Sequence, residues 1–166
     1  MAVNPVINLA DVPLRQSGNG KGFKAMIGPF SHLIGSDGIG CMLHVVEPGD
    51  KAFPFHAHHQ IHELFVILEG EGTYRHGDQQ FPVRAGDVCA APAGPGAARA
   101  HQLVNTGSTT LRYLGLSTKI DTEVVEYPDS GKFGVVSHFD WGNPQAGGIR
   151  FIGRTNMSLD YFDGEE

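Results

Sequence analysis

The chain has 166 residues, a formal net charge of -6 and 40% hydrophobic residues. This length suits one well-filled core and is short for two, so we expect a single domain over residues 1–166. The acidic residues are spread along the chain and no basic run occurs, which argues against nucleic acid and anionic membranes as partners. Glycine (23) and proline (10) form about a fifth of the chain, below the roughly 25–30% typical of disorder.

The same features bear on cellular location. The N-terminus has no basic opening and no sustained apolar core, so it does not resemble a signal peptide. The longest apolar run, residues 64–68, has the length of a strand and is far too short to span a membrane. Cys41 and Cys89 are expected to be reduced, because no export signal accompanies them. We therefore expect a cytoplasmic protein.

Short β-rich segments separated by turn residues run through the middle of the chain. The expected strands lie at residues 41–46, 53–58, 64–68, 73–75, 80–83, 87–91, 101–104 and 109–117. A hairpin turn is predicted at residues 76–78, and we predict no amphipathic helix between residues 40 and 118. Strands at such regular spacing indicate an all-β sandwich or barrel.

The two ends of the chain are less clearly patterned. Residues 1–24 show little periodicity, whereas residues 119–166 contain β-leaning pieces at 122–125, 134–136 and 149–152. Such flanks can extend a sheet, cap a barrel or exchange with a second subunit, and the sequence leaves these alternatives open. The run at residues 64–68 is apolar on both faces and needs cover from a second sheet or subunit, so we expect a homodimer.

The most informative pattern is the pair His56 and His58, followed by Glu63 and, far downstream, by His101. Side chains at positions i and i+2 of a strand point to the same face, so two imidazoles can converge on one point. Glu63 can join them if the chain turns back after His58. Imidazole and carboxylate ligands suit one divalent transition metal ion such as iron, manganese, nickel, cobalt or zinc. The residues therefore predict a metal site inside a β-structure.

Two further histidines lie beside this pattern and leave alternatives open. His62 precedes Glu63 by one residue, and a shifted turn would present His62 to the metal instead. His59 is expected in the turn, where it approaches the site from outside at best. Either histidine could act as a base, but nothing in the sequence identifies the catalytic residue. Asn105 is expected to hydrogen-bond the backbone and so to play a structural part.

The central stretch resembles the cupin superfamily. The first cupin motif is a glycine, a spacer, His-x-His, a glutamate and a closing glycine, and residues 49–70 read GDKAFPFHAHHQIHELFVILEG. The second motif is a glycine, Pro-x-Gly, a histidine and an asparagine, and residues 86–105 read GDVCAAPAGPGAARAHQLVN. The first spacer is one residue longer than usual, and six residues separate Gly94 from His101 where the family usually has two. We expect this insertion at the mouth of the barrel.

The resemblance covers roughly residues 40–118 and implies a double-stranded β-helix, the cupin jelly roll, with residues 1–39 and 119–166 as flanking extensions. It also implies a metal bound by His56, His58, Glu63 and His101. Four protein ligands on an octahedral ion leave two adjacent positions open, for a chelating substrate or for water and O₂. One carboxylate against a dication leaves about +1 on the site, which favours an anionic or enediol-like small molecule.

Three functions suit such a site. Single-domain cupins with a tail like residues 127–133 resemble bacterial proteins labelled as sugar-phosphate isomerases, in which a metal would polarise a carbonyl and its neighbouring hydroxyl. The same ligands around iron(II) would suit a dioxygenase that binds substrate and O₂. A non-catalytic module that binds a small molecule through its metal is the third. We expect isomerisation of a sugar or sugar phosphate first, although no basic cluster for a phosphate is apparent in the sequence.

Overall fold

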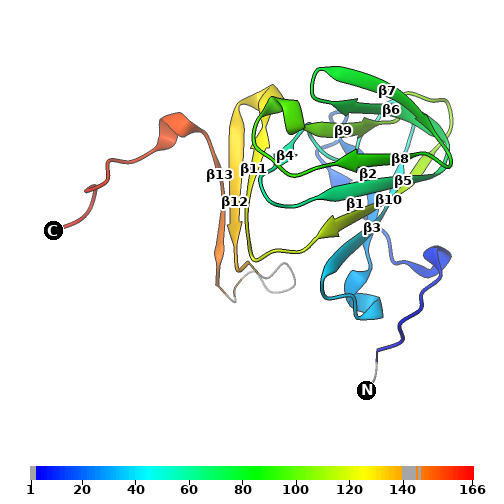
Figure 1. The fold of residues 1–166 in the computed structure, drawn as a ribbon, viewed down its shortest axis with the longest axis horizontal. Coiled ribbons are helices and arrows are strands. Elements are labelled where there is room, and N and C mark those ends of the chain that lie inside the picture. The colour runs from blue at the N-terminus through cyan, green and yellow to red at the C-terminus, as the bar shows by residue number, and fades with distance from the viewer. Residues whose placement is uncertain (1–2, 140–144, 146) are drawn as a thin grey trace.

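The fold is built from strands. The computed structural model describes residues 3–139, 145 and 147–166, and these contain thirteen strands and five short 3-10 helices (Figure 1). None of the described residues lies in an α-helix, so the all-β prediction is confirmed. The strands form three sheets in which every neighbouring pair is antiparallel. This arrangement is consistent with the predicted jelly roll.

The largest sheet has six strands and contains much of the predicted barrel. In spatial order these are β1 (Arg15–Gly18), β2 (Lys24–Pro29), β3 (Ile39–Val46), β10 (Leu111–Thr118), β5 (Glu63–Glu69) and β8 (Val88–Ala91). A three-stranded sheet faces it, in the order β7 (Gln79–Arg84), β6 (Glu71–His76) and β9 (His101–Val104). The predicted hairpin at residues 76–78 joins β6 to β7, where Gly77 has a φ of 60° that suits glycine.

The hydrophobic core lies between these two sheets. Alternate residues of β10 are buried, because successive side chains of a strand point to opposite faces. Leu111 and Ile67 are almost fully enclosed in this core, at 0% and 1% exposure. Tyr74, Val83 and Leu103 come from the facing sheet and pack into the same cluster. Burying an aliphatic or aromatic side chain stabilises the fold by roughly 1.5–3 kcal/mol, so this alternation holds the two sheets together.

The predicted strand at residues 53–58 is wrong in its extent. Only β4 (Ala57–His58) is a strand, and it pairs with the C-terminal extension through Val125 and Glu126 rather than with the barrel. Pro54 has no backbone N–H to donate to a neighbouring strand, which explains why the regular pairing does not reach it. His56 still exchanges two backbone hydrogen bonds with His101, at 3.2 and 2.8 Å. This bridge brings the two sequence motifs together.

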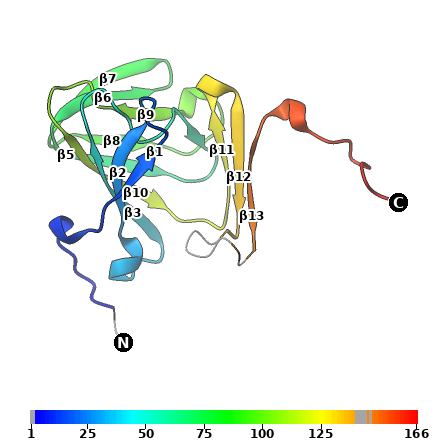
Figure 2. The same cartoon turned by 180° about the vertical axis from the view of Figure 1, so that it is seen from behind.

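Both extensions form sheet structure, on different sides of the barrel (Figure 2). The N-terminal extension adds β1 and β2 to the edge of the six-stranded sheet. The C-terminal extension supplies β11 (Thr122–Tyr127), β12 (Lys132–Ser137) and β13 (Ile149–Gly153) to a four-stranded sheet that ends on β4. Residues 154–166 then run away from the body of the molecule (Figure 1).

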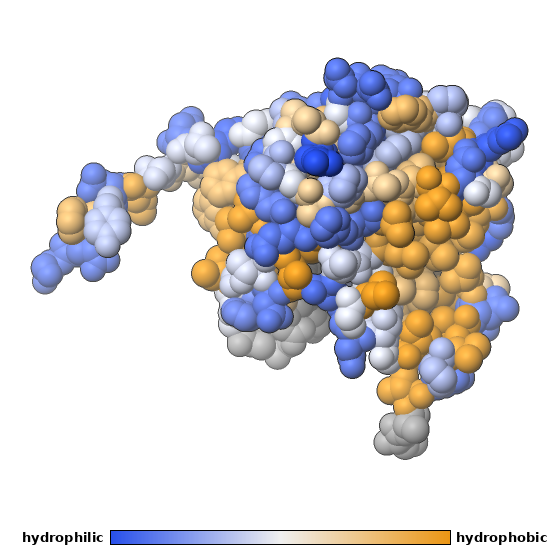
Figure 3. All heavy atoms as spheres, in the orientation of Figure 1, coloured by the Kyte–Doolittle hydropathy of each residue, from blue (hydrophilic) through white to orange (hydrophobic). Residues whose placement is uncertain are grey.

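Apolar side chains remain exposed on one side of the molecule. Figure 3 shows apolar atoms gathered on the side where β5, β8 and β10 lie. Leu64 in β5 is 44% exposed, and Val88 in β8 is 62% exposed. These side chains point away from the core, because they alternate with the buried Phe65 and Cys89. Within the described residues, no helix has the length and apolar character needed to cross a membrane.

Candidate metal centre

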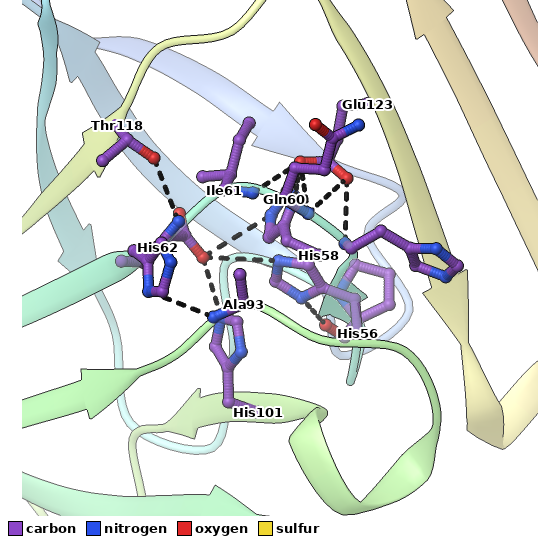
Figure 4. Close-up of polar contacts among 12 residues, drawn as sticks. His56, His58, Gln60, Ile61, His62, Ala93, His101, Thr118 and Glu123 are labelled. Carbon is purple, nitrogen blue, oxygen red and sulfur yellow. Dashed lines mark hydrogen bonds and ion pairs between the residues drawn. The ribbon is translucent and has the colours of Figure 1, made fainter.

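Four polar side chains named in the sequence meet where the barrel joins the C-terminal sheet. His58 lies in β4, His56 precedes that strand by one residue, Glu63 begins β5 and His101 begins β9. Figure 4 shows the three imidazoles turned toward a common region. The i, i+2 spacing places the first two on one side of the chain. The backbone bridge between His56 and His101 adds the third.

One oxygen of Glu63 is the centre of this group. Its Oε2 lies 2.9 Å from Nε2 of His101, 3.5 Å from Nε2 of His58 and 3.9 Å from Nε2 of His56. The candidate ligand atoms of His56, His58 and Glu63 all lie within 4.8 Å of one another. His101 joins them through its hydrogen bond to Glu63 and is only 2% exposed. The four residues are thus brought together as the sequence predicted.

The structure places His62 and His59 outside this group. Nδ1 of His62 accepts a hydrogen bond from the backbone N–H of Ala93 at 3.3 Å. The Nε2 atom of His59 lies 2.6 Å from Oε1 of Glu126, and both side chains are about one-third exposed. Neither histidine lines the cavity described below. A shifted turn that presents His62 in place of Glu63 is therefore not what the structure contains.

The charge state of the group suits metal binding. Burial lowers the pKa of His56 to about 4, with further lowering by the neighbouring His101 and His58. Burial also lowers the pKa of His58. Burial alone would raise the pKa of Glu63, but the hydrogen bond from His101 and the electrostatic effect of the histidines outweigh it and hold the pKa at about 2. At neutral pH, His56 and His58 therefore present neutral imidazoles beside the ionised carboxylate of Glu63.

The donor set fits a divalent transition metal. Neutral imidazole nitrogens and a carboxylate oxygen are the ligands such ions take in proteins. Nδ1 of His56 lies 2.8 Å from the carbonyl oxygen of Pro54, a hydrogen bond that leaves Nε2 as the free donor atom toward Glu63. The other ring nitrogens, Nδ1 of His58 and of His101, are buried and have no hydrogen-bond partner among the described residues.

We expect the metal-free protein to lose stability as the pH falls from about 6.5 to about 4. Burial lowers the pKa of His44, which is 2% exposed and stacks on Tyr113, from 6.5 to about 4. Between these values the unfolded chain binds a proton that the folded chain excludes, so acidification favours unfolding. The difference corresponds to about 3 kcal/mol for His44 alone. Thermal unfolding at pH 7, 5.5 and 4 measures it.

The control for this pH dependence is His44→Phe, which keeps an aromatic ring against Tyr113 but has no titrating group. It should lose clearly less stability over the same pH range. An unchanged pH dependence in His44→Phe would show that other groups account for the whole effect.

Three of the four residues, His56, His58 and Glu63, border a cavity of about 510 Å³. Its first wall is the barrel, which contributes apolar side chains such as Met42, Phe53 and Phe65 beside the histidines. Its second wall is the C-terminal sheet. Directly paired residues of antiparallel strands lie side by side on one face, and the register aligns Glu123, Val136 and Arg150 in one row that faces the cavity. The extension therefore encloses the candidate metal centre.

The C-terminal wall supplies polar groups that the sequence reading missed. Tyr127 lies near His56, with ring centroids 6.3 Å apart, and burial raises the pKa of its hydroxyl while Arg150 lowers it. Arg150 is the one arginine or lysine among the described residues that line the cavity. The β-leaning pattern at residues 122–125 and 149–152 indicated the strands. Nothing in the pattern indicated that they would face the histidines, because this depends on pairing between β11 and β4.

The six-residue insertion before His101 lies outside the lining of the metal cavity. Its segment forms a short 3-10 helix, Ala97–Arg99, and borders a second hollow that also contains Arg75 and Asp129. None of the described residues 95–100 lines the metal cavity. Arg75 and Asp129 bind each other through two hydrogen bonds, at 2.7 and 2.8 Å. The insertion therefore borders this second hollow and not the metal cavity.

Comparison with known proteins identifies the class of domain. Residues 42–117 match the family model of the cupin domain. Together with the jelly-roll sheets and the two motifs, this match means that the central barrel of the chain is a cupin domain. The resemblance inferred from the sequence is thereby confirmed for the part of the chain where it was inferred.

Individual relatives share parts of the chain. A curated oxalate-binding protein of Thermotoga maritima is 33% identical over 69 residues, and the match spans 42% of this chain and 54% of that protein, about half its length. The structure is similar to that of a presumed sugar phosphate isomerase from Acidithiobacillus ferrooxidans, with a TM-score of 0.78 and 21% identity over 94% of this chain and 96% of that one.

A second solved structure is similar over nearly the same extent. It is a sugar phosphate isomerase of the cupin superfamily from Silicibacter pomeroyi, with a TM-score of 0.75 and 24% identity. The similarity covers 93% of this chain and 95% of that one. Because the identity is low, the similarity to these two structures establishes a shared fold and nothing beyond it. This shared fold includes both extensions.

Proposed function

We propose that the chain binds one divalent transition metal ion through His56, His58, Glu63 and His101, and that the metal holds a small, oxygen-bearing molecule in the adjoining cavity. The observation that carries the proposal is the convergence of three imidazole Nε2 atoms on one oxygen of Glu63. Burial and low pKa values keep His56 and His58 neutral and Glu63 ionised at neutral pH, which is the state that binds metal.

The reaction we propose first is isomerisation of a sugar or sugar phosphate. The bound metal would supply polarisation of a carbonyl and its neighbouring hydroxyl. The raised pKa of Tyr127 keeps its hydroxyl protonated, so it can donate a hydrogen bond to a substrate oxygen. Arg150 supplies a positive charge on the facing wall, which favours an anionic substrate. The two similar structures described as sugar phosphate isomerases add support by analogy.

The test begins with elemental analysis of protein purified without a metal-affinity tag. Near one transition metal per chain is expected, and none after reconstitution would contradict the proposal. The loaded protein is then incubated with aldose and ketose phosphates in D₂O without oxygen. Isomerisation should replace a carbon-bound hydrogen by solvent deuterium at the carbon that changes between carbonyl and alcohol. NMR detects this deuterium. Turnover that requires both iron and O₂ would instead identify a dioxygenase.

A second candidate is a non-catalytic module that binds a small carboxylate. Two observations favour it: the relative that is described as an oxalate-binding protein, and a cavity with largely apolar walls apart from the metal group and a few polar side chains. Calorimetry with oxalate, on metal-loaded and metal-free protein, separates the two functions. Saturable binding that requires the metal, without turnover of any phosphate sugar, would favour the binding module.

We also propose that the chain forms a homodimer in the cytoplasm. The exposed apolar side chains of Leu64 and Val88 lie on neighbouring strands and would be covered by a second copy. Light scattering should give twice the 17.8 kDa of one chain, and Val88→Glu should shift the mass toward one chain. A mass of 17.8 kDa for the unaltered protein would contradict the dimer.

A further inference from the structure

Glu123 is a buried carboxylate that is not one of the four candidate metal ligands. It lies in β11 of the C-terminal extension and is 5% exposed. It accepts hydrogen bonds from four backbone N–H groups, which belong to His59 (2.8 Å), Gln60 (3.2 Å), Ile61 (2.7 Å) and Val124 (2.8 Å). Hydrogen bonds to an ionised acceptor are stronger than neutral ones, so this carboxylate is a firm anchor for the segment it contacts.

The anchored segment connects two members of the metal group. Residues 59–62 lead from His58 to Glu63, and three of their backbone N–H groups converge on the one carboxylate. The path of these four residues determines where Glu63 enters β5, and so where its carboxylate lies. Glu123 therefore fixes the connection whose register decides whether Glu63 or His62 faces the histidines.

The same carboxylate faces the back of one imidazole. Oε2 of Glu123 lies 3.9 Å from Nδ1 of His58, while Nε2 of that ring lies 3.5 Å from Glu63. Nδ1 of His58 is buried and has no hydrogen-bond partner within the part of the chain that the structure describes. A carboxylate behind a metal-binding histidine favours the tautomer with a proton on the near nitrogen, and so leaves the far nitrogen free to bind metal.

We propose that Glu123 is a positioning residue for the metal centre: it holds the backbone of residues 59–61 in place and orients His58 so that Nε2 faces Glu63. This inference rests on the proposed metal binding. It assigns to the C-terminal extension a part in building the centre, in addition to enclosing the cavity. The side chain acts through its neighbours and does not itself enter the group of ligands.

The test compares Glu123→Gln with Glu126→Gln. Glutamine has nearly the shape of glutamate, but its amide nitrogen cannot accept from the backbone N–H groups. Glu126 lies on the same strand, and its carboxylate bonds the side chain of His59 and none of the backbone N–H groups of residues 59–61 that Glu123 holds. It is therefore a matched control. The two readouts are Co²⁺ affinity, measured by competition with a chelator, and amide hydrogen exchange of the metal-free protein.

Glu123→Gln is expected to bind Co²⁺ about 10–100-fold more weakly than the unaltered chain, the usual effect of removing a partner of a metal ligand. The amides of residues 59–61 should exchange at least about tenfold faster in the metal-free variant, because only one of the two accepting oxygens remains and it no longer carries a negative charge. The visible spectrum of bound Co²⁺ should also change. Glu126→Gln should leave the Co²⁺ affinity within about twofold of the unaltered chain.

A purely structural part for Glu123 would lower the thermal stability and leave both the Co²⁺ affinity and spectrum of the folded variant unchanged, which would overturn the inference. An equal loss of affinity in Glu126→Gln would also overturn it. If Glu123→Gln does not fold, Glu123→Asp replaces it and should weaken Co²⁺ binding, because the shorter carboxylate cannot reach all four N–H groups. Failure of the unaltered chain to bind Co²⁺ would reject the proposed function and the inference together.

Discussion

A Glu63→Ala variant should bind its divalent metal more than about 100-fold more weakly than the unaltered chain, since loss of a ligand costs more than loss of a ligand's partner. The reason is that one oxygen of Glu63 lies within 3.9 Å of all three imidazole nitrogens and carries the negative charge of the group. His58→Ala and His101→Ala should release the metal in the same way. The measurement is metal content per chain, with circular dichroism to show that the barrel stays folded.

The matched control is His62→Ala, which removes the neighbouring histidine and should retain the metal. Nδ1 of His62 accepts a hydrogen bond from the backbone N–H of Ala93, and His62 does not line the cavity. If His62→Ala emptied the site and Glu63→Ala did not, the shifted turn considered from the sequence would be the correct arrangement in solution.

An Asn105→Ala variant should be destabilised by about 3 kcal/mol, as expected when several buried hydrogen-bonding groups lose their partner. Asn105 is fully buried, and its Nδ2 donates to the carbonyl oxygens of Val46 (2.7 Å) and Thr109 (2.9 Å). Its Oδ1 accepts from the N–H of Gly107 at 3.0 Å. For a chain of this size, thermal unfolding should begin roughly 6–12 °C lower.

The control lies in the same turn. Thr106→Ala removes an exposed hydroxyl that hydrogen-bonds to Thr73, and its effect should stay within about 0.5 kcal/mol. The folded Asn105→Ala protein should still bind metal, which separates support of the fold from ligation. A melting temperature equal to that of the unaltered chain would show that water replaces the lost hydrogen bonds.

The structural part expected for Asn105 could be predicted because the motif places it at a turn after β9, where side-chain amides commonly bond the backbone. The strands of the barrel could also be predicted, because alternation of apolar residues and turn glycines are local signals. The extent of the strand at residues 53–58 could not. Its pairing partner lies some 70 residues later in β11, and local sequence carries no record of such a partner.

For the candidate metal centre, too, some features could be predicted from the sequence and others could not. The sequence by itself determined an all-β chain with a cupin barrel, and it named four residues that the structure brings together, because these features depend on local periodicity and on two short motifs. Tertiary structure alone decided that Glu63 and not His62 meets the histidines, since this depends on how residues 59–62 are held by Glu123.

Tertiary structure also decided that Tyr127 and Arg150 face the same cavity as the histidines. Their place follows from the register of β11 with β12 and of β12 with β13, and from the docking of β11 on β4. Such long-range pairing is selected by the burial and hydrogen bonding of the whole fold. No pattern within either segment could therefore have revealed it.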